Sequence, residues 1–216
     1  MMTKRIVLCI LFSMSISSFN LMYSQLYKNI WINGNVGLSE IAGDFGRSTS
    51  LGQDKGLNMG VQIIKQTNFG LNIGVGYEFN HINNTFFNTS TGLMDANVET
   101  NLHELELVFN YNLVPLFIEN YPFKFSIGWI YSIYQSNHNF NRTDFQNTFG
   151  MYKNFSTGTI TYPNLILSYD FGKIQLGLSS KIGFANNDYL DGLHSKFTGS
   201  NDAIFVTSIS LGYRIL

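Results

Sequence analysis

The sequence predicts an all-β protein, an eight-stranded antiparallel transmembrane up-and-down β-barrel, and three observations carry this prediction. Apolar and polar residues alternate with a period of two along eight segments, which is the pattern of strands whose two faces meet different surroundings. The links between these segments are short and long in turn, and charged residues avoid one face. Bacterial outer-membrane barrels combine an even strand number with short turns at one end and long loops at the other.

The composition agrees with this fold class and argues against a nucleic-acid-binding function. Charged residues make up 12% of the 216 residues and aromatic residues make up 15%, whereas charged residues form about 25% of an ordinary soluble domain. Much of the surface is therefore expected to face something other than water. The formal net charge of −1 gives no electrostatic reason to expect a nucleic-acid partner.

The N-terminus has the pattern of a secretory signal peptide. Lys4 and Arg5 precede an apolar run, Ile6–Ile16, and a cleavage site is expected between Ser24 and Gln25. The apolar run is shorter than the ~20 residues that a membrane-spanning helix needs. We therefore expect a cleavable signal peptide over residues 1–24 and an outer-membrane β-barrel domain over residues 25–216.

The period-two pattern defines the strands and their links. The expected strands are Lys28–Leu38, Leu57–Lys65, Phe69–His81, Leu102–Leu113, Phe123–Gln135, Thr159–Phe171, Ile174–Phe184 and Ala203–Leu216. Short links are expected at Gln66–Asn68, Val114–Pro122 and Gly172–Lys173, and long polar links at Ser39–Gly56, Ile82–Asn101, Ser136–Gly158 and Ala185–Asp202. An even strand number leaves both chain ends at the short-link end, which is the periplasmic end in bacterial barrels.

The side chains indicate which face of the sheet meets lipid. One face carries aliphatic and aromatic residues, and the other carries Asn, Ser, Gly, Gln and the charges of the strand interiors. A Lys or Arg on the lipid face at mid-membrane depth costs about 2 to 4 kcal/mol, so the apolar face is expected to point outward. Lys65, His81 and His103 depart from this pattern, but each is near a strand end, where the cost falls.

The charged residues of the inward face form an expected lumen network of Glu78, Glu104, Glu106, Lys124, Asp170, Lys181 and Arg214. Inward positions of an eight-stranded barrel are within side-chain reach of one another. The network is expected to be a structural set of ion pairs that satisfies buried charge, and a gated ion path is the functional alternative. Open diffusion of solutes is not expected, because further residues also project inward: Ile64, Val108, Ile130, Tyr134 and Ile166.

Outward aromatic residues are expected to form belts at both membrane interfaces. The belt near the short links contains Phe69, Tyr111, Phe123, Phe171 and Tyr213, and the belt near the long links contains Tyr77, Phe79, Tyr131, Phe184 and Phe205. A soluble β-sandwich or a lipocalin-like barrel would also have one apolar face, turned inward. Its other face would need to be well solvated, whereas here that face is rich in glycine, serine and asparagine.

Two segments carry a family resemblance. Leu105-Glu106-Leu107-Val108-Phe109-Asn110-Tyr111-Asn112-Leu113, followed by Phe123-Lys124-Phe125-Ser126-Ile127-Gly128-Trp129, resembles a strand, a moderate turn and a return strand of small outer-membrane β-barrel proteins of the Bacteroidetes type, the porin-family or outer membrane protein β-barrel domain proteins. The C-terminal Ile209–Leu216 is similar to the closing strand of that family. One departure is that the outward series of this strand stops at Ile215, where the family has an aromatic residue.

No catalytic, cofactor-binding or metal-binding residues are expected. Cys9, the single cysteine, lies in the signal peptide, so the mature chain offers no cysteine-based metal site. His194 stands beside Ser195, but adjacent residues of an extended chain point to opposite sides, so His194 is badly placed to activate Ser195. Asp188 and Asp191 are explained as turn formers.

The sequence therefore predicts a small, monomeric, non-enzymatic protein of the bacterial outer membrane with a lumen filled by side chains and a structural or surface-interaction role through its long extracellular loops. Its expected partners are outer-membrane lipids and, during biogenesis, the barrel assembly machinery. The surface ligand is not identified. A narrow or gated channel for small solutes is one alternative, and an adhesion or ligand-binding barrel is another, suggested by loop aromatics: Phe86, Phe87, Phe140, Phe145, Phe149 and Phe155.

Overall fold

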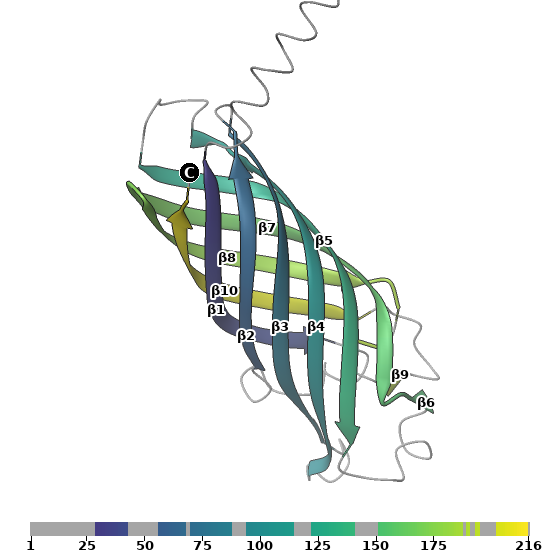
Figure 1. Ribbon diagram of the computed structural model, residues 1–216. Helices are drawn as coiled ribbons and strands as arrows, with labels where there is room; N and C mark the ends of the chain where they lie inside the picture. The colour runs from purple at the N-terminus through teal and green to yellow at the C-terminus, as the bar shows by residue number, and fades with distance from the viewer. Residues whose placement is uncertain are drawn as a thin grey trace, which may run out of the picture.

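The chain folds into a closed antiparallel barrel of eight strands in the computed structural model. The structure describes residues 29–42, 56–67, 70–87, 94–114, 122–140, 151–187, 189–190, 193–194 and 202–215. The predicted signal peptide lies outside these residues. Each barrel strand pairs with the next barrel strand along the chain, and the first pairs with the last, so the predicted up-and-down barrel is confirmed (Figure 1).

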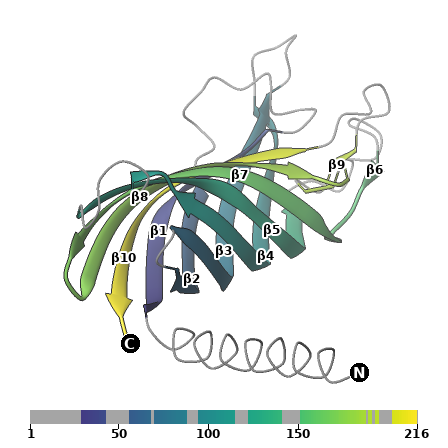
Figure 2. The same ribbon diagram turned by 90° about the horizontal axis from the view of Figure 1, so that it is seen from above.

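The strand bounds are as follows. The barrel strands are β1 (Ile30–Ala42), β2 (Gly56–Gln66), β3 (Leu71–Phe87), β4 (Met94–Asn112), β5 (Phe123–Phe140), β7 (Phe155–Phe171), β8 (Ile174–Ala185) and β10 (Ala203–Arg214). Around the barrel their order is β1-β10-β8-β7-β5-β4-β3-β2. The short strands β6 (Met151–Tyr152) and β9 (Leu193–His194) pair with each other beside the end of the barrel that carries the long links (Figure 2).

One end of the barrel is closed by tight turns, as the sequence predicts. Gly70, with φ 94°, and Gly172, with φ 79°, occupy the left-handed backbone region at the β2–β3 and β7–β8 turns, where glycine has no steric penalty. Trp31 of β1 pairs with Arg214 of β10 at the same end. The first and last strands therefore begin and end at the short-turn end.

The strands at the other end extend further than the sequence predicts. Most of the expected link Ile82–Asn101 is strand, because β3 and β4 stay paired from Ile82 opposite Thr100 up to Phe87 opposite Met94. Parts of the expected link Ser136–Gly158 likewise belong to β5 and β7. Polar residues occupy both faces of these extensions. The alternation of apolar and polar residues that identifies a strand in a sequence is therefore missing, although the backbone hydrogen bonds between the strands continue.

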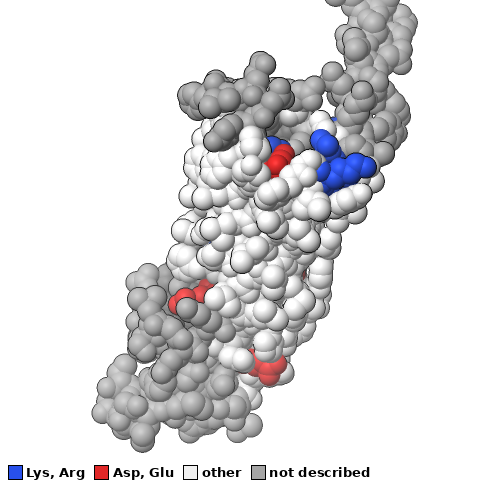
Figure 3. All heavy atoms as spheres, turned by 90° about the vertical axis from the view of Figure 1, so that its left-hand side faces the viewer, with Lys and Arg blue, Asp and Glu red and all other residues white. Residues whose placement is uncertain are grey.

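The outer surface of the barrel is an apolar band. Leu105 and Ile209 are 64% and 62% exposed, and the large side chains around them on the outside are aliphatic or aromatic. Figure 3 shows one side of this surface as uncharged between the two ends, with Lys and Arg atoms near the short-turn end. The apolar face therefore points outward, and the alternative of a barrel with its apolar face inward is wrong. Among the described residues, no helix is long and apolar enough to cross a membrane.

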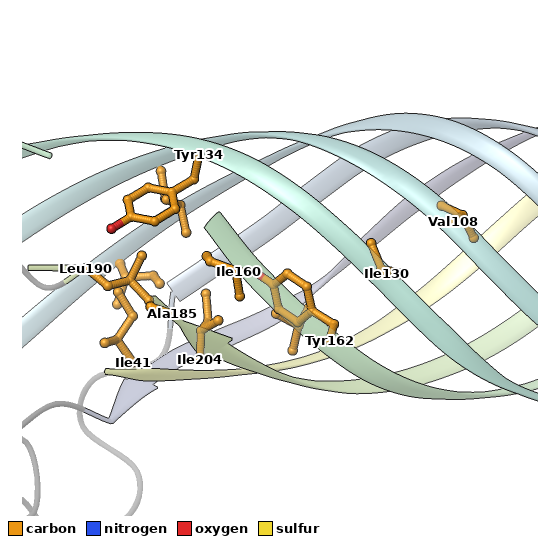
Figure 4. Packing of buried hydrophobic residues seen from close by; sticks show 12 residues of the cluster. Ile41, Val108, Ile130, Tyr134, Ile160, Tyr162, Ala185, Leu190 and Ile204 are labelled. Atoms are coloured by element: carbon orange, nitrogen blue, oxygen red, sulfur yellow. The ribbon is translucent and has the colours of Figure 1, made fainter. Parts of the chain in front are cut away.

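The inside of the barrel differs from the sequence expectation in its half near the long links. That half holds most of a buried apolar cluster that extends well beyond the inward residues expected there, while two members, Val108 and Ile130, lie apart from the others toward the short-turn end (Figure 4). Leu190, from the segment after β8, is also fully buried in this cluster. The cluster consists of Ile41, Ile82, Leu102, Val108, Ile130, Tyr134, Ile160, Tyr162, Ala185, Leu190, Ile204 and Val206.

Candidate functional site

A buried lysine joins two glutamates at the centre of the lumen. The Lys181 Nζ atom on β8 lies 2.7 Å from Glu78 Oε1 on β3 and 2.7 Å from Glu106 Oε1 on β4. All three side chains are buried. Because charge buried without a partner is costly, this pairing lets the barrel hold three ionised groups away from bulk water.

Amide side chains complete the hydrogen bonding of these two carboxylates. Gln62 Nε2 donates to Glu106 Oε2 at 2.8 Å, and Asn35 Nδ2 donates to Glu78 Oε2 at 3.3 Å. The bridge therefore contacts residues from β1, β2, β3, β4 and β8. It crosses the barrel from wall to wall and forms what we term the central layer.

Glu104 belongs to the same layer but is held by neutral donors. Tyr162 donates its hydroxyl to the Glu104 carboxylate at 2.7 and 2.8 Å, and Asn80 Nδ2 donates to it at 3.0 Å. Ser132 donates a further hydrogen bond. These three donors stand at inward positions of their strands, but they are uncharged and no motif marks them in the sequence.

The remaining charged residues of the expected network lie in a second layer at the short-turn end. Lys124 Nζ lies 2.6 Å from Asp170 Oδ2 and donates to Gln66 Oε1 at 2.9 Å. Arg214 and Lys124 each lie 5.7 Å from the ring of the buried Trp31, within the range of a cation–π contact. The structure thus divides the expected network into two separate layers.

A polar chamber lies between the two layers. It has a volume of about 60 Å³ and is bounded by Glu78 and Lys181 of the central layer and by Lys124 of the short-turn layer. Its wall is dominated by amide and hydroxyl side chains, among them Asn33, Asn110, Asn164, Ser179 and Ser208. Toward the long-link end, most of the apolar cluster lies beyond the central layer.

The aromatic residues expected to form belts lie on the outside of the barrel where the structure describes them. Phe69 lies outside the described residues. Phe79 and Tyr111 are half-buried, and the others are exposed: Tyr77, Phe123, Tyr131, Phe171, Phe184, Phe205 and Tyr213. The Tyr77 hydroxyl lies 2.6 Å from His103 Nδ1, at the edge of the apolar band nearest the long links.

A buried histidine near the long-link end was not singled out by the sequence analysis. His138 lies on β5 beyond the apolar band, where the outward neighbours Asn137 and Asn139 are polar. Its Nδ1 atom lies 3.0 Å from Thr100 Oγ1, and its Nε2 atom lies 2.9 Å from Ser136 Oγ. Burial lowers the pKa of His138 to about 4, and a hydrogen bond with the Tyr189 backbone opposes this shift.

The other residues considered for chemistry are not brought together in the described part of the chain. His194 lies in β9, where its backbone is opposite Met151. Cys9, Asp188, Asp191 and Ser195, and the loop residues Phe145 and Phe149, lie outside the described residues. Within the residues that the structure describes, no group of three or more His, Cys, Asp or Glu residues could hold a metal ion.

Comparison with known proteins identifies the fold. No family model matches the sequence, and no curated protein matches it either. The crystal structure of the neisserial surface protein A, NspA, superposes with a TM-score of 0.55 at 14% identity, covering 86% of this chain and 97% of that chain. OprG of Pseudomonas aeruginosa gives a TM-score of 0.49 at 11% identity, covering 88% of this chain and 98% of that chain. The similarity to NspA shows that this chain has the fold of small eight-stranded membrane β-barrels.

Proposed function

We propose that this chain is an integral protein of the bacterial outer membrane whose lumen is closed to solutes and which acts at the cell surface through its long-link end. The membrane location is supported by the apolar band around a closed barrel. The single observation that supports the closed lumen is the bridge from Lys181 to Glu78 and Glu106, backed by the apolar cluster.

The two barriers act by different physical means. An ion that crosses the central layer has to displace a lysine held by two carboxylates at 2.7 Å each. It then meets the apolar cluster, which offers few polar atoms to replace its water of hydration. Eight strands leave an interior just wide enough for side chains to fill. These barriers lie in series, so the opening of one leaves the other in place.

The surface role is supported by the extended strands. Beyond the apolar band, β3, β4, β5 and β7 continue as one sheet with polar outward residues, including Asn83, Glu99, Asn101, Gln135 and Asn137. Phe155, at the start of β7, is 50% exposed at the same end. A rigid sheet outside the membrane presents a fixed surface to a partner, and rigid elements position contacts better than loops do.

A planar-bilayer recording of the refolded protein tests the closed lumen. We expect no stable unitary conductance from protein whose folding is verified by its shifted migration before boiling. The matched variants Glu104→Gln and Glu106→Gln distinguish a closed lumen from a gated channel. A stable conductance that these variants abolish would contradict the closed lumen and would establish the gated channel, which the polar chamber favours as the second candidate.

The membrane location has its own test. After cell fractionation, we expect the protein in the outer-membrane fraction in a form that migrates differently before and after boiling. Recovery of folded protein in the soluble periplasmic fraction would contradict the proposed location whatever the conductance measurements give.

A further inference from the structure

The chamber between the two charged layers is lined by buried amide oxygens that lack a hydrogen-bond donor. Four buried amide oxygens have no hydrogen-bond partner in the described part of the chain, namely Oδ1 of Asn33, Asn35, Asn110 and Asn164. Asn110 and Asn164 are 2% and 5% exposed. A buried polar atom without a partner costs about 1 to 3 kcal/mol, so four in one chamber call for an occupant that satisfies them.

The strand register explains why these oxygens lack protein donors. Asn33 stands opposite Gly212, Asn35 opposite Gly60, and Asn110 opposite Gly128 on the neighbouring strands. In each pair the amide oxygen lies over the glycine, at the place where a side chain would otherwise begin. Glycine provides no side-chain donor, and it leaves room inside a narrow barrel.

The charged groups around the chamber are already engaged in ion pairs or hydrogen bonds with protein groups. The two layers that bound it contain four carboxylates, Glu78, Glu104, Glu106 and Asp170, and three cations, Lys124, Lys181 and Arg214. Of these groups, Glu78, Lys124 and Lys181 line the chamber, and Asp170 and Glu106 pair with the two lysines. Buried charge is normally compensated by a nearby opposite charge.

We propose that the chamber binds a small monovalent metal cation, such as Na⁺ or K⁺, through the amide oxygens of Asn110 and Asn164. Hard cations prefer uncharged and anionic oxygen ligands, which are the groups that this wall provides. Unpartnered amide oxygens disfavour an anion, which would need donors in their place. The volume of about 60 Å³ excludes a large organic cation, since one water molecule alone needs roughly 10 to 15 Å³ measured in this way.

The ion reaches the chamber from the short-turn end. On that side the barrier is the exchangeable contact between Lys124 and Asp170, whose side chains are partly exposed. On the other side lie the fully buried central layer and the apolar cluster. The site is thus a dead-end pocket, and its occupancy is independent of whether the barrel conducts.

Trp31 provides a reporter for this site, because it is buried at the short-turn layer and contacts Lys124. The experiment uses refolded protein with Trp129→Phe, so that Trp31 is the single tryptophan. NaCl, KCl and N-methylglucamine chloride are titrated at constant ionic strength. We expect a saturable change in Trp31 fluorescence with Na⁺ or K⁺ that N-methylglucamine, which is too large for the chamber, does not produce.

Two variants tie the response to the chamber. Asn110→Leu with Asn164→Leu removes two oxygens at similar volume and is expected to weaken cation binding about tenfold or more. Asn137→Leu, on the outward face of β5, is the matched control and should leave the affinity unchanged. An equal response to all three salts, or an unchanged affinity in the chamber variant, would overturn the proposal and leave water as the occupant.

A crystallographic measurement covers the case in which the chamber variant does not fold. Crystals of the unmodified protein grown with Rb⁺ are expected to show an anomalous peak in the chamber, beside the Asn110 and Asn164 amides. A chamber without such a peak at saturating Rb⁺ would contradict the proposal. The bilayer recordings above are unaffected by either result.

Discussion

Lys181 and Glu78 lie on opposite walls of the barrel and meet in its centre. β8 and β3 are four strands apart in either direction around the ring, yet Lys181 Nζ lies 2.7 Å from Glu78 Oε1. The pair therefore spans the full width of the lumen. It connects two parts of the sheet that share no backbone hydrogen bonds.

Removal of this lysine should destabilise the barrel strongly. Lys181→Met leaves Glu78 and Glu106 buried without their cation. Loss of one partner of a buried ion pair costs about 3 to 5 kcal/mol. Urea unfolding in lipid vesicles measures the loss, and Lys173→Met, in the exposed β7–β8 turn, is the control with little expected effect. A loss below that of the control would mean that the bridge is not formed in the membrane.

A charge on the apolar band should cost stability according to its depth. Leu107 points outward from the middle of β4, between Leu105 and Phe109. Leu107→Arg is expected to lower the free energy of unfolding by about 2 to 4 kcal/mol, while an arginine near the interface costs about 0 to 1 kcal/mol. Asn137→Arg, outward on β5 beyond the band, is the matched control. Equal effects of the two substitutions would contradict the assigned membrane depth.

His138 should make stability depend on pH. Burial lowers its folded-state pKa to about 4, whereas an unfolded histidine titrates near ~6.5. As the pH falls, the unfolded chain therefore takes up the proton first. The stability contributed by neutral His138 is present above about pH 6.5 and is lost as the pH falls toward 4, with a slope of at most about 1.4 kcal/mol per pH unit.

The variant His138→Gln isolates this effect from that of other groups. We expect the difference in unfolding free energy between the original protein and the variant to change between pH 7.5 and pH 4, measured by urea unfolding at each pH. A difference that stays constant over this range would mean that His138 is exposed in the folded protein.

Glycine is required where the lumen is crowded and is dispensable on the lipid side. A Cβ atom at Gly183 would meet Ile204 Cγ2 at 2.6 Å and Ile160 Cγ2 at 2.7 Å, whereas a Cβ atom at Gly34 would meet nothing within 4 Å. Overpacking costs about 1 to 3 kcal/mol, so Gly183→Ala should destabilise the barrel and Gly34→Ala should not. Thermal unfolding of both variants measures this contrast, and equal midpoints would contradict the packing of the lumen.

The periodicity of the sequence predicted the barrel and the centres of its strands, because each change of face appears directly as a change of polarity. It could not predict the strand ends at the long-link end. Between Ile82 and Phe87 both faces of β3 are largely polar, so the hydrogen-bonded ladder with β4 leaves no hydrophobic signature. Only tertiary pairing specifies where these strands stop.

The sequence predicted which charged side chains point into the lumen, but not at which height along the barrel axis they lie. Inward positions identified Lys181, Glu78 and Glu106, but the height at which they meet depends on the stagger of all eight strands. The inward apolar residues predicted from the sequence included Val108, Ile130 and Tyr134, but Leu102 and Ile204, which also belong to the cluster, were not identified because they stand on a largely polar face. Leu190 enters the lumen from a link, and local sequence does not report such a contact.

Quenching of tryptophan fluorescence by brominated lipid acyl chains tests most directly which face of the sheet meets lipid. Trp129 is 57% exposed on the apolar band, and Trp31 is 1% exposed inside the lumen. In vesicles of brominated phospholipid, protein with Trp31→Phe, which retains Trp129, should be strongly quenched, and protein with Trp129→Phe, which retains Trp31, should be nearly unaffected. Strong quenching of Trp31 together with weak quenching of Trp129 would contradict the account.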